Sequence, residues 1–352
     1  MNKTMNSIGW KYGLMGVIFA GLQFLIAGLL QWLLPEFTDK YSIYLTFALI
    51  LFVDGICVLF LFLVTHSMPK AEIEKKRLGF GPFLLCVLIM YGLVFVGAII
   101  GLCFHLPLTI PFSKGADNDE LTKLMLNSNI FLRILVVGIL APVFEELMFR
   151  KILIDHLAVK GQLVAILASG LMFGLFHGNF QQAFFAAFIG CLFAYIYIKT
   201  GKIIYTIILH MFLNTATSAI TVGIVQWYMK AVEKVGYVDV PELNDYEMIQ
   251  YLENNPATTS DLLTLGLPTI VLFAWIGLLF ILAVGGLITL LILVCLKKIR
   301  INRVEGDLTY GKQVASIFAS PCMYIFYVVC FLLFLETYLP DIIQSVIKWT
   351  RN

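Results

Sequence analysis

Nine stretches of the chain are each long enough and apolar enough to cross a lipid bilayer as a helix. A spanning helix needs roughly 20 mostly apolar residues, and such stretches lie at about 12–34, 42–65, 82–105, 131–156, 162–178, 180–199, 203–227, 268–296 and 315–339. Only 13% of the residues are charged and 60% are hydrophobic, whereas a soluble domain carries about 25% charged residues. Because backbone in lipid must satisfy its hydrogen bonds internally, the sequence predicts an all-α fold, a polytopic membrane helical bundle with about nine transmembrane helices.

The basic residues favour one orientation of this bundle. If successive loops alternate sides, 16 of the 24 Lys and Arg residues fall on the side of the N-terminus. Loops rich in Lys and Arg remain in the cytoplasm, so we expect an integral membrane protein with a cytoplasmic N-terminus. The first span is long and no small-residue cleavage site follows it, so we expect a retained helix rather than a signal peptide. The net charge of +2 indicates no particular partner, and we expect no nucleic-acid partner.

Intramembrane polarity is unevenly distributed, which divides the chain into four blocks. Residues 1–110 contain three N-terminal spans, and residues 130–227 contain four closely spaced spans with almost all of the buried polar groups. An acidic extracytoplasmic loop is expected at 228–267, followed by C-terminal transmembrane helices within 268–352. We therefore expect a functional core at 130–227 and scaffold or substrate-docking roles for the flanking spans.

The core block contains two adjacent carboxylates and an arginine inside an apolar helix. Residues 145 to 150 read Glu-Glu-Leu-Met-Phe-Arg, and ionisable groups at membrane depth usually pair, face a bundle interior and mark a working site. Glu146 and Arg150 are four residues apart and share a helix face, so we expect an ion pair. Glu145 is turned by about 100° and could face a cavity as a base. The alternative is an ion-pair network that only fixes helix packing.

Two later apolar helices each contribute one histidine. His177 ends one of them, and His210 lies within the next but one, with Asn214 four residues further along the same face. Glu145 with His177 could deprotonate a water molecule, while His210 and Asn214 could donate hydrogen bonds to a developing oxyanion. The same atoms allow a zinc site with Glu145, His177 and His210 as ligands and an open position for water. The sequence does not decide between these readings, so zinc is a candidate cofactor and none is certain.

Small residues near these positions predict close helix packing. Gly170 and Gly174 lie one turn before His177, and Gly97 and Gly101 lie in the third span. Glycines four residues apart allow two helix backbones to approach closely.

Taken together, these motifs resemble the CPBP (CAAX protease and bacteriocin-processing) family of intramembrane proteases, also called the Abi or type II CAAX prenyl endopeptidase family. Its motifs EExxxR, FxxxH and HxxxN match, in order, Glu145, Glu146 and Arg150, then Phe173 and His177, then His210 and Asn214. The match covers roughly residues 130–220 in the same order and spacing. The flanking spans carry none of these motifs.

This resemblance implies a helical bundle with a cavity open to the cytosol or the membrane. It implies that Glu145 and His177 activate water and that His210 and Asn214 form the oxyanion hole. Eukaryotic members cut prenylated C-terminal tails, and bacterial members are linked to bacteriocin processing and self-immunity. Some members are named metalloproteases.

The sequence therefore favours an intramembrane endopeptidase whose partners are the lipid bilayer and a membrane-associated peptide or protein substrate. One alternative is a protease-like immunity or scaffold protein that does not cleave. Another is an ion-coupled or proton-coupled transporter, although such transporters usually show internal repeats and none is visible here. Two further intramembrane acids, Asp54 and Glu336, have no assigned role.

Overall fold

The computed structural model describes residues 2–109, 120–235, 259–301 and 310–351. Every regular element in these ranges is a helix, which confirms the predicted all-α membrane bundle. In chain order the elements are α1 (Asn2–Leu33), α2 (Pro35–Thr65), α3 (Phe80–Thr109), α4 (Glu120–Asn127), α5 (Ile130–Arg133), α6 (Ala141–Glu146), α7 (Leu153–Leu157), α8 (Gln162–Phe176), α9 (Phe180–Thr200), α10 (Ile203–Thr215), α11 (Val222–Val235), α13 (Thr259–Cys295), α14 (Tyr310–Ala319) and α15 (Met323–Arg351).

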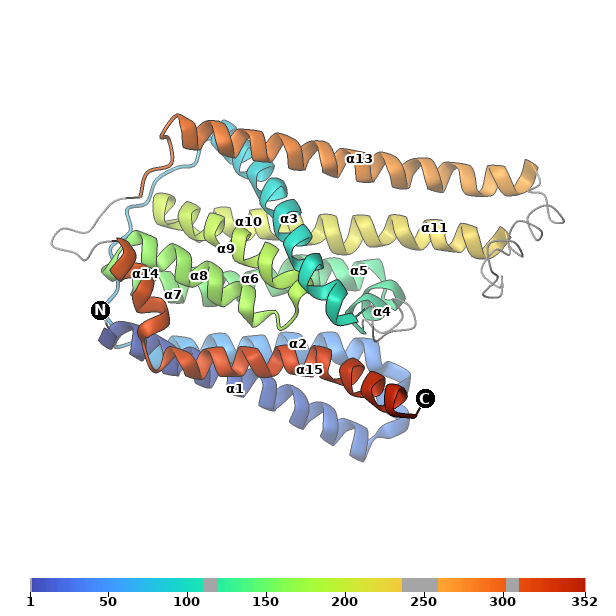
Figure 1. Ribbon diagram of the computed structural model, residues 1–352, viewed down its shortest axis with the longest axis horizontal. Helices are drawn as coiled ribbons and strands as arrows, with labels where there is room; N and C mark the ends of the chain where they lie inside the picture. The colour runs from blue at the N-terminus through green and yellow to red at the C-terminus, as the bar shows by residue number, and fades with distance from the viewer. Residues whose placement is uncertain (1, 110–119, 236–258, 302–309, 352) are drawn as a thin grey trace.

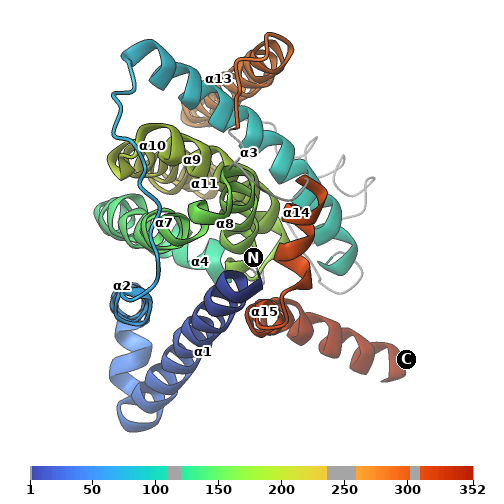
Figure 2. The same ribbon diagram turned by 90° about the vertical axis from the view of Figure 1, so that its left-hand side faces the viewer.

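A central group of helices, α5 to α10, lies between two flanking groups (Figure 1). Helices α3 and α13 pack together on one side, and α1, α2 and α15 pack together on the other, as the view in Figure 2 also shows. The central group holds most of the fully buried side chains, whereas α13 and the outer faces of α1 and α15 expose many large apolar residues. Such faces suit contact with lipid, because apolar side chains gain nothing from burial within protein when the solvent is itself apolar.

Six helices in the described part of the chain are long and apolar enough to span a membrane. They begin at Lys3, Pro35, Phe80, Phe180, Ile203 and Leu263. The apolar helices 162–176 and 323–339 are shorter, and the segment 130–157 is divided between α-helical and π-helical turns. The count of nine spans therefore stays a prediction.

Segments that were predicted to share the N-terminal side gather at one end of the molecule (Figure 1). The connection between α2 and α3 crosses the ends of α7 and α9 there. The Ala71 N–H donates to the Asp155 carbonyl at 2.7 Å, and the Lys76 N–H donates to the Thr200 carbonyl at 2.8 Å. This arrangement agrees with the alternation of loops on which the expected orientation was based.

The predicted glycine contacts bring helices together around the core. Gly97 and Gly101 in α3 lie directly against the first turns of α9, and Gly170 and Gly174 in α8 lie against its next turns. A Cβ at any of the four would overlap atoms of α9, because backbones at this separation leave no room for a side chain. Both glycine pairs therefore fix α9 against its neighbours.

The acidic loop expected at 228–267 falls largely on residues 236–258, which lie outside the described residues. Its flanks are helical: α11 continues to Val235 and α13 begins at Thr259. Both helices are therefore longer than hydropathy alone indicated. The division into four blocks remains a prediction.

Candidate active site

The helix that carries the paired glutamates changes its hydrogen-bonding pattern on both sides of them. Between α5 and α7, the backbone forms π-helical turns at Ile134–Leu140 and Leu147–Ile152, and α6 lies between them. Such turns are rare in proteins, and many of those that occur lie at functional sites. Two distant side chains bind backbone carbonyls of the second π segment: Tyr12 of α1 donates to the Met148 carbonyl at 2.6 Å, and Ser169 of α8 donates to the Phe149 carbonyl at 2.7 Å.

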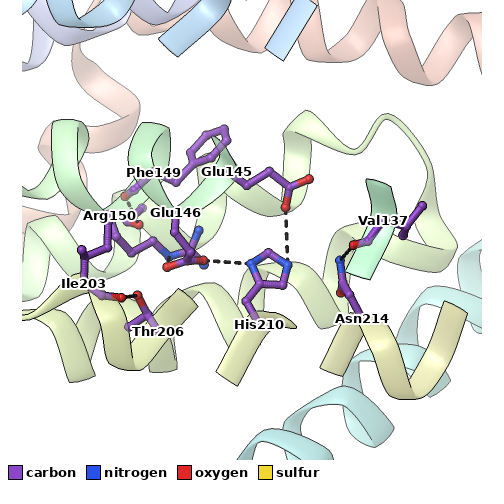
Figure 3. A network of polar contacts seen from close by, with 10 residues as sticks. Val137, Glu145, Glu146, Phe149, Arg150, Ile203, Thr206, His210 and Asn214 are labelled. Atoms are coloured by element: carbon purple, nitrogen blue, oxygen red, sulfur yellow. Dashed lines mark hydrogen bonds and ion pairs between the residues drawn. The ribbon is translucent and has the colours of Figure 1, made fainter. Parts of the chain in front are cut away.

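A proline at the start of α6 explains the place of Asn214. In the first π segment the Ala141 N–H donates to the Val136 carbonyl, five residues back. The next residue, Pro142, has no N–H to donate, so the Val137 carbonyl lacks the corresponding backbone donor. The Asn214 side-chain amide donates to that carbonyl at 3.1 Å (Figure 3). Asn214 therefore joins α10 to the glutamate-bearing helix, and its second amide hydrogen is not used in this bond.

The predicted ion pair between Glu146 and Arg150 is present and completely buried. Glu146 Oε2 lies 3.3 Å from Arg150 Nε, and both side chains have 0% exposure. The Arg150 guanidinium also lies 4.2 Å above the ring of Phe173 and 5.5 Å from the ring of Phe193. Two aromatic faces and one carboxylate therefore surround the buried cation, an arrangement in which desolvated cation–π contacts contribute about 2 kcal/mol.

His210 lies between the two carboxylates (Figure 3). Its Nδ1 is 3.0 Å from Glu146 Oε1, and its Nε2 is 3.4 Å from Glu145 Oε2. A carboxylate paired with arginine accepts hydrogen bonds, so Nδ1 carries a proton and donates to Glu146. The other ring nitrogen then faces Glu145 across a gap that one proton can occupy, either on the imidazole or on the carboxyl group. With that proton, the side chains of Arg150, Glu146, His210 and Glu145 together carry no net charge.

Phe173, which entered the sequence analysis only as a motif position, contacts three of the predicted site residues. Its face lies under Arg150, and its ring meets the rings of His177 and His210 edge-on, with centroid distances of 4.9 and 5.7 Å. Such perpendicular arrangements are favourable because the ring edge is positive and the face negative. Only the fold reveals that this phenylalanine separates the two histidines and supports the arginine.

His177 caps α8 and is oriented by its own helix. Its Nδ1 is 2.8 Å from the Phe173 carbonyl. A carbonyl only accepts, so Nδ1 holds the proton and Nε2 keeps its lone pair. Among the described residues, His177 has no hydrogen bond or ion pair to Glu145, and the histidine beside that carboxylate is His210. The structure therefore shows no direct bond between Glu145 and His177, and their joint action on a water molecule stays a prediction.

The zinc centre allowed by the sequence does not match the geometry. Within the ranges that the structure describes, no three His, Cys, Asp or Glu side chains gather in a way that could hold a metal ion. The described geometry therefore does not bring Glu145, His177 and His210 together as a set of zinc ligands.

Asp54 joins this site from the N-terminal block. It lies in the middle of α2, which packs against α6, and it is only 5% exposed. Its carboxyl group interacts electrostatically with that of Glu145. In the described part of the chain Asp54 has no hydrogen bond or ion pair, and both of its neighbours Val53 and Cys57 are fully buried. The sequence showed an acid at membrane depth here, but the distance of more than 90 residues from Glu145 concealed their proximity.

We expect the substitution Asp54→Asn to stabilise the protein. A charged acid at a helix centre in the membrane is unfavourable by about 2.5–3.5 kcal/mol on insertion scales, and the amide removes the like-charge interaction with Glu145. The free energy of unfolding in mixed micelles should rise by on the order of 1 kcal/mol. Asp39→Asn is the matched control, because Asp39 lies on the same helix but is exposed and bonded to Gln31. A lower stability for Asp54→Asn than for the control would show that Asp54 has a stabilising partner.

Two comparisons with known proteins match part of this chain. Residues 127–216 match the model of the family described as Rce1-like, type II CAAX prenyl endopeptidase Rce1-like. The protein named "Putative membrane peptidase YdiL" of Bacillus subtilis (strain 168) is 34% identical over 85 residues, which are 24% of this chain and 35% of that protein. No solved structure gives a significant match.

The resemblance to CAAX-type membrane peptidases is therefore confirmed for the central part of the chain. The matched stretch contains all of the predicted site residues, from Glu145 to Asn214. The chain spans only about a third of the length of its curated relative. The family match includes neither α1 to α3 nor α13 to α15.

Proposed function

We propose that this chain is an intramembrane endopeptidase that hydrolyses a peptide bond in a membrane-associated peptide or protein. The observation that supports this function most directly is the buried chain of contacts from Arg150 through Glu146 to His210 and Glu145. It provides one partly accessible carboxylate, that of Glu145, whose side chain is 21% exposed. This carboxylate lies beside His210, whose ring is oriented by Glu146. The match of residues 127–216 to the Rce1-like family supports the same reading.

Glu145 is the proposed base. It takes a proton from a water molecule, and the lone pair of His177 Nε2 accepts the other hydrogen of that water and helps to orient it. The resulting hydroxide attacks the carbonyl carbon of the scissile peptide bond. Glu145 suits this role because its neighbour Glu146 is occupied by Arg150 and His210, which leaves Glu145 as the site's available acceptor.

His210 and Asn214 are the proposed oxyanion donors. Once the proton from water has passed from Glu145 Oε2 to His210 Nε2, that N–H can donate to the oxygen of the tetrahedral intermediate, and the second amide hydrogen of Asn214 can do the same. Glu146 holds His210 through Nδ1 and stabilises the imidazolium, as the aspartate does in serine proteases. The proton then moves to the amine nitrogen as the C–N bond breaks, so that one water is consumed and no net charge is left.

A cleavage assay tests this function. The full-length protein, reconstituted in liposomes, should cleave a fluorogenic farnesylated peptide that ends in a CAAX sequence, and mass spectrometry should find the cut after the prenylated cysteine. Because no three ligating side chains gather in the described part of the chain, we expect the turnover in excess chelator to remain within about twofold of the untreated enzyme. A protein that leaves this peptide and a panel of unprenylated membrane peptides intact would favour the non-cleaving scaffold. Loss of turnover with chelator that added zinc restores would favour a metalloprotease.

We also propose that the protein lies in a bacterial plasma membrane with its N-terminus in the cytoplasm. The basic segments predicted for that side occupy one end of the molecule (Figure 1), and the matched relative comes from Bacillus subtilis. A cysteine introduced into the connection at residues 66–79 should react with a membrane-impermeant reagent only after lysis. Reaction in intact cells would reverse the orientation.

A further inference from the structure

The loop between α8 and α9 begins with His177 and contains only three residues. Gly178 adopts a left-handed conformation with φ of +66°, which favours glycine. Asn179 caps α9 by accepting the Gln182 N–H at 2.9 Å and donates to the His177 carbonyl at 3.0 Å. These local bonds define the shape of the loop, and residues from two other helices define its position.

Helix α15 binds this loop through one face of its apolar part. Thr337 Oγ1 donates to the Gly178 carbonyl at 3.0 Å, and the Phe180 N–H donates to the hydroxyl oxygen of Tyr338 at 2.9 Å. Phe334 packs on the ring of Phe180 with centroids 4.7 Å apart. The Gly178 carbonyl in the loop and the Phe180 N–H at the start of α9 are therefore both bonded to α15.

Helix α3 completes the contact through His105. Its Nε2 lies 2.9 Å from the amide nitrogen of Gln181, and its Nδ1 lies 3.1 Å from the hydroxyl oxygen of Tyr338. The amide nitrogen only donates, so Nε2 accepts and Nδ1 carries the proton. The Tyr338 oxygen then accepts two hydrogen bonds, from His105 and from Phe180, which matches the two lone pairs of a phenol.

We propose that His105, Thr337 and Tyr338 form a latch that positions His177 for catalysis. This inference rests on the proposed function. His177 directly follows α8 and begins a loop, whereas the chain remains helical on both sides of the other site residues, so the position of its backbone depends on that loop. Both latch helices lie outside the stretch matched by the family, which gives the flanking spans a role in the geometry of the active site. A displacement of about 1 Å can lower a rate about a hundredfold.

The latch is tested with the double variant Thr337→Val/Tyr338→Phe, which removes both polar contacts to the loop and keeps the side-chain shapes. The matched control is Tyr327→Phe, because Tyr327 also lies on α15 and donates to a backbone carbonyl, that of Ile317, far from the loop. In the double variant, amide hydrogen exchange at Phe180 should accelerate about tenfold. The kcat for the farnesylated peptide should fall at least about tenfold, with KM unchanged within about twofold. The control should match the wild type in all three.

The exchange measurement tests the latch, and the kinetic measurement tests its effect on catalysis. Unchanged exchange at Phe180 in the double variant overturns the latch. Faster exchange with unchanged kcat overturns the positioning of His177 by it. If the wild type cleaves no peptide, the proposed function fails on its own evidence, and exchange at Phe180 still decides for or against the latch.

Discussion

Replacing Glu145 by glutamine should reduce peptide cleavage by about a thousandfold or more while the protein remains folded and inserted. The amide has the size of the carboxylate but cannot take a proton from water, and a positioned base contributes roughly 10²–10⁴-fold to a rate. The loss should appear in kcat with the farnesylated peptide, and the thermal unfolding midpoint in detergent should stay near that of the wild type.

Glu36→Gln is a suitable control for this experiment. Glu36 lies in the first turn of α2, is exposed, and has no part in the site. Its turnover should equal that of the wild type. If Glu145→Gln kept more than a tenth of the wild-type kcat, Glu145 would not be the base, and His177 Nε2 would be the next candidate for that role.

The second large effect is expected from Arg150→Met. The substitution keeps an apolar stem between Phe173 and Phe193 but leaves Glu146 buried without its cation, and breaking a buried pair in this way is unfavourable by roughly 3–5 kcal/mol. The free energy of unfolding in mixed micelles should fall by about that amount. The double variant Glu146→Gln/Arg150→Met should recover most of the loss, because no unpaired charge remains.

A second ion pair, between Lys151 and Asp155 nearby in the chain, is the control for the effect of burial. Lys151 and Asp155 are also four residues apart, with Nζ and Oδ2 separated by 2.7 Å, but the Lys151 side chain is 50% exposed. The Asp155 side chain is 11% exposed and also accepts a hydrogen bond from Tyr197. A pair with one exposed partner contributes less than a fully buried pair, so Lys151→Met should lower stability clearly less than Arg150→Met. Equal losses for Arg150→Met and Lys151→Met would mean that burial does not govern the strength of the Glu146 pair.

Several local features could be predicted because they depend on residues one or two turns apart. The i, i+4 spacing predicted the ion pair between Glu146 and Arg150. The same spacing predicted that His210 and Asn214 share one face of α10. The glycine spacing in α3 and α8 indicated two close helix contacts, both of which the fold contains. In each case the period of a helix decides which side chains share a face, whatever the rest of the chain does.

The partners across helices could not be predicted in this way. The motifs gave no sign that His210 contacts Glu145 or that the ring of Phe173 contacts both histidines. The π-helical turns on both sides of α6 contribute to this, since each one changes the direction in which later side chains point. In the apolar segment 131–144, Pro142 was the one residue that could have indicated a change in the helix.

By itself, the sequence determined the membrane class, the helical fold and the contacts within each helix, because lipid permits few backbone structures and the helical period is constant. Only the tertiary structure decided that Asp54 lies near enough to Glu145 for their carboxyl groups to interact, and that Tyr338 contacts the Phe180 N–H beside the loop of His177. These contacts join residues far apart in the chain, and they depend on which faces of separate helices pack together. Most helix faces in this chain are apolar and similar to one another, so close packing at glycines and a few hydrogen bonds select among them.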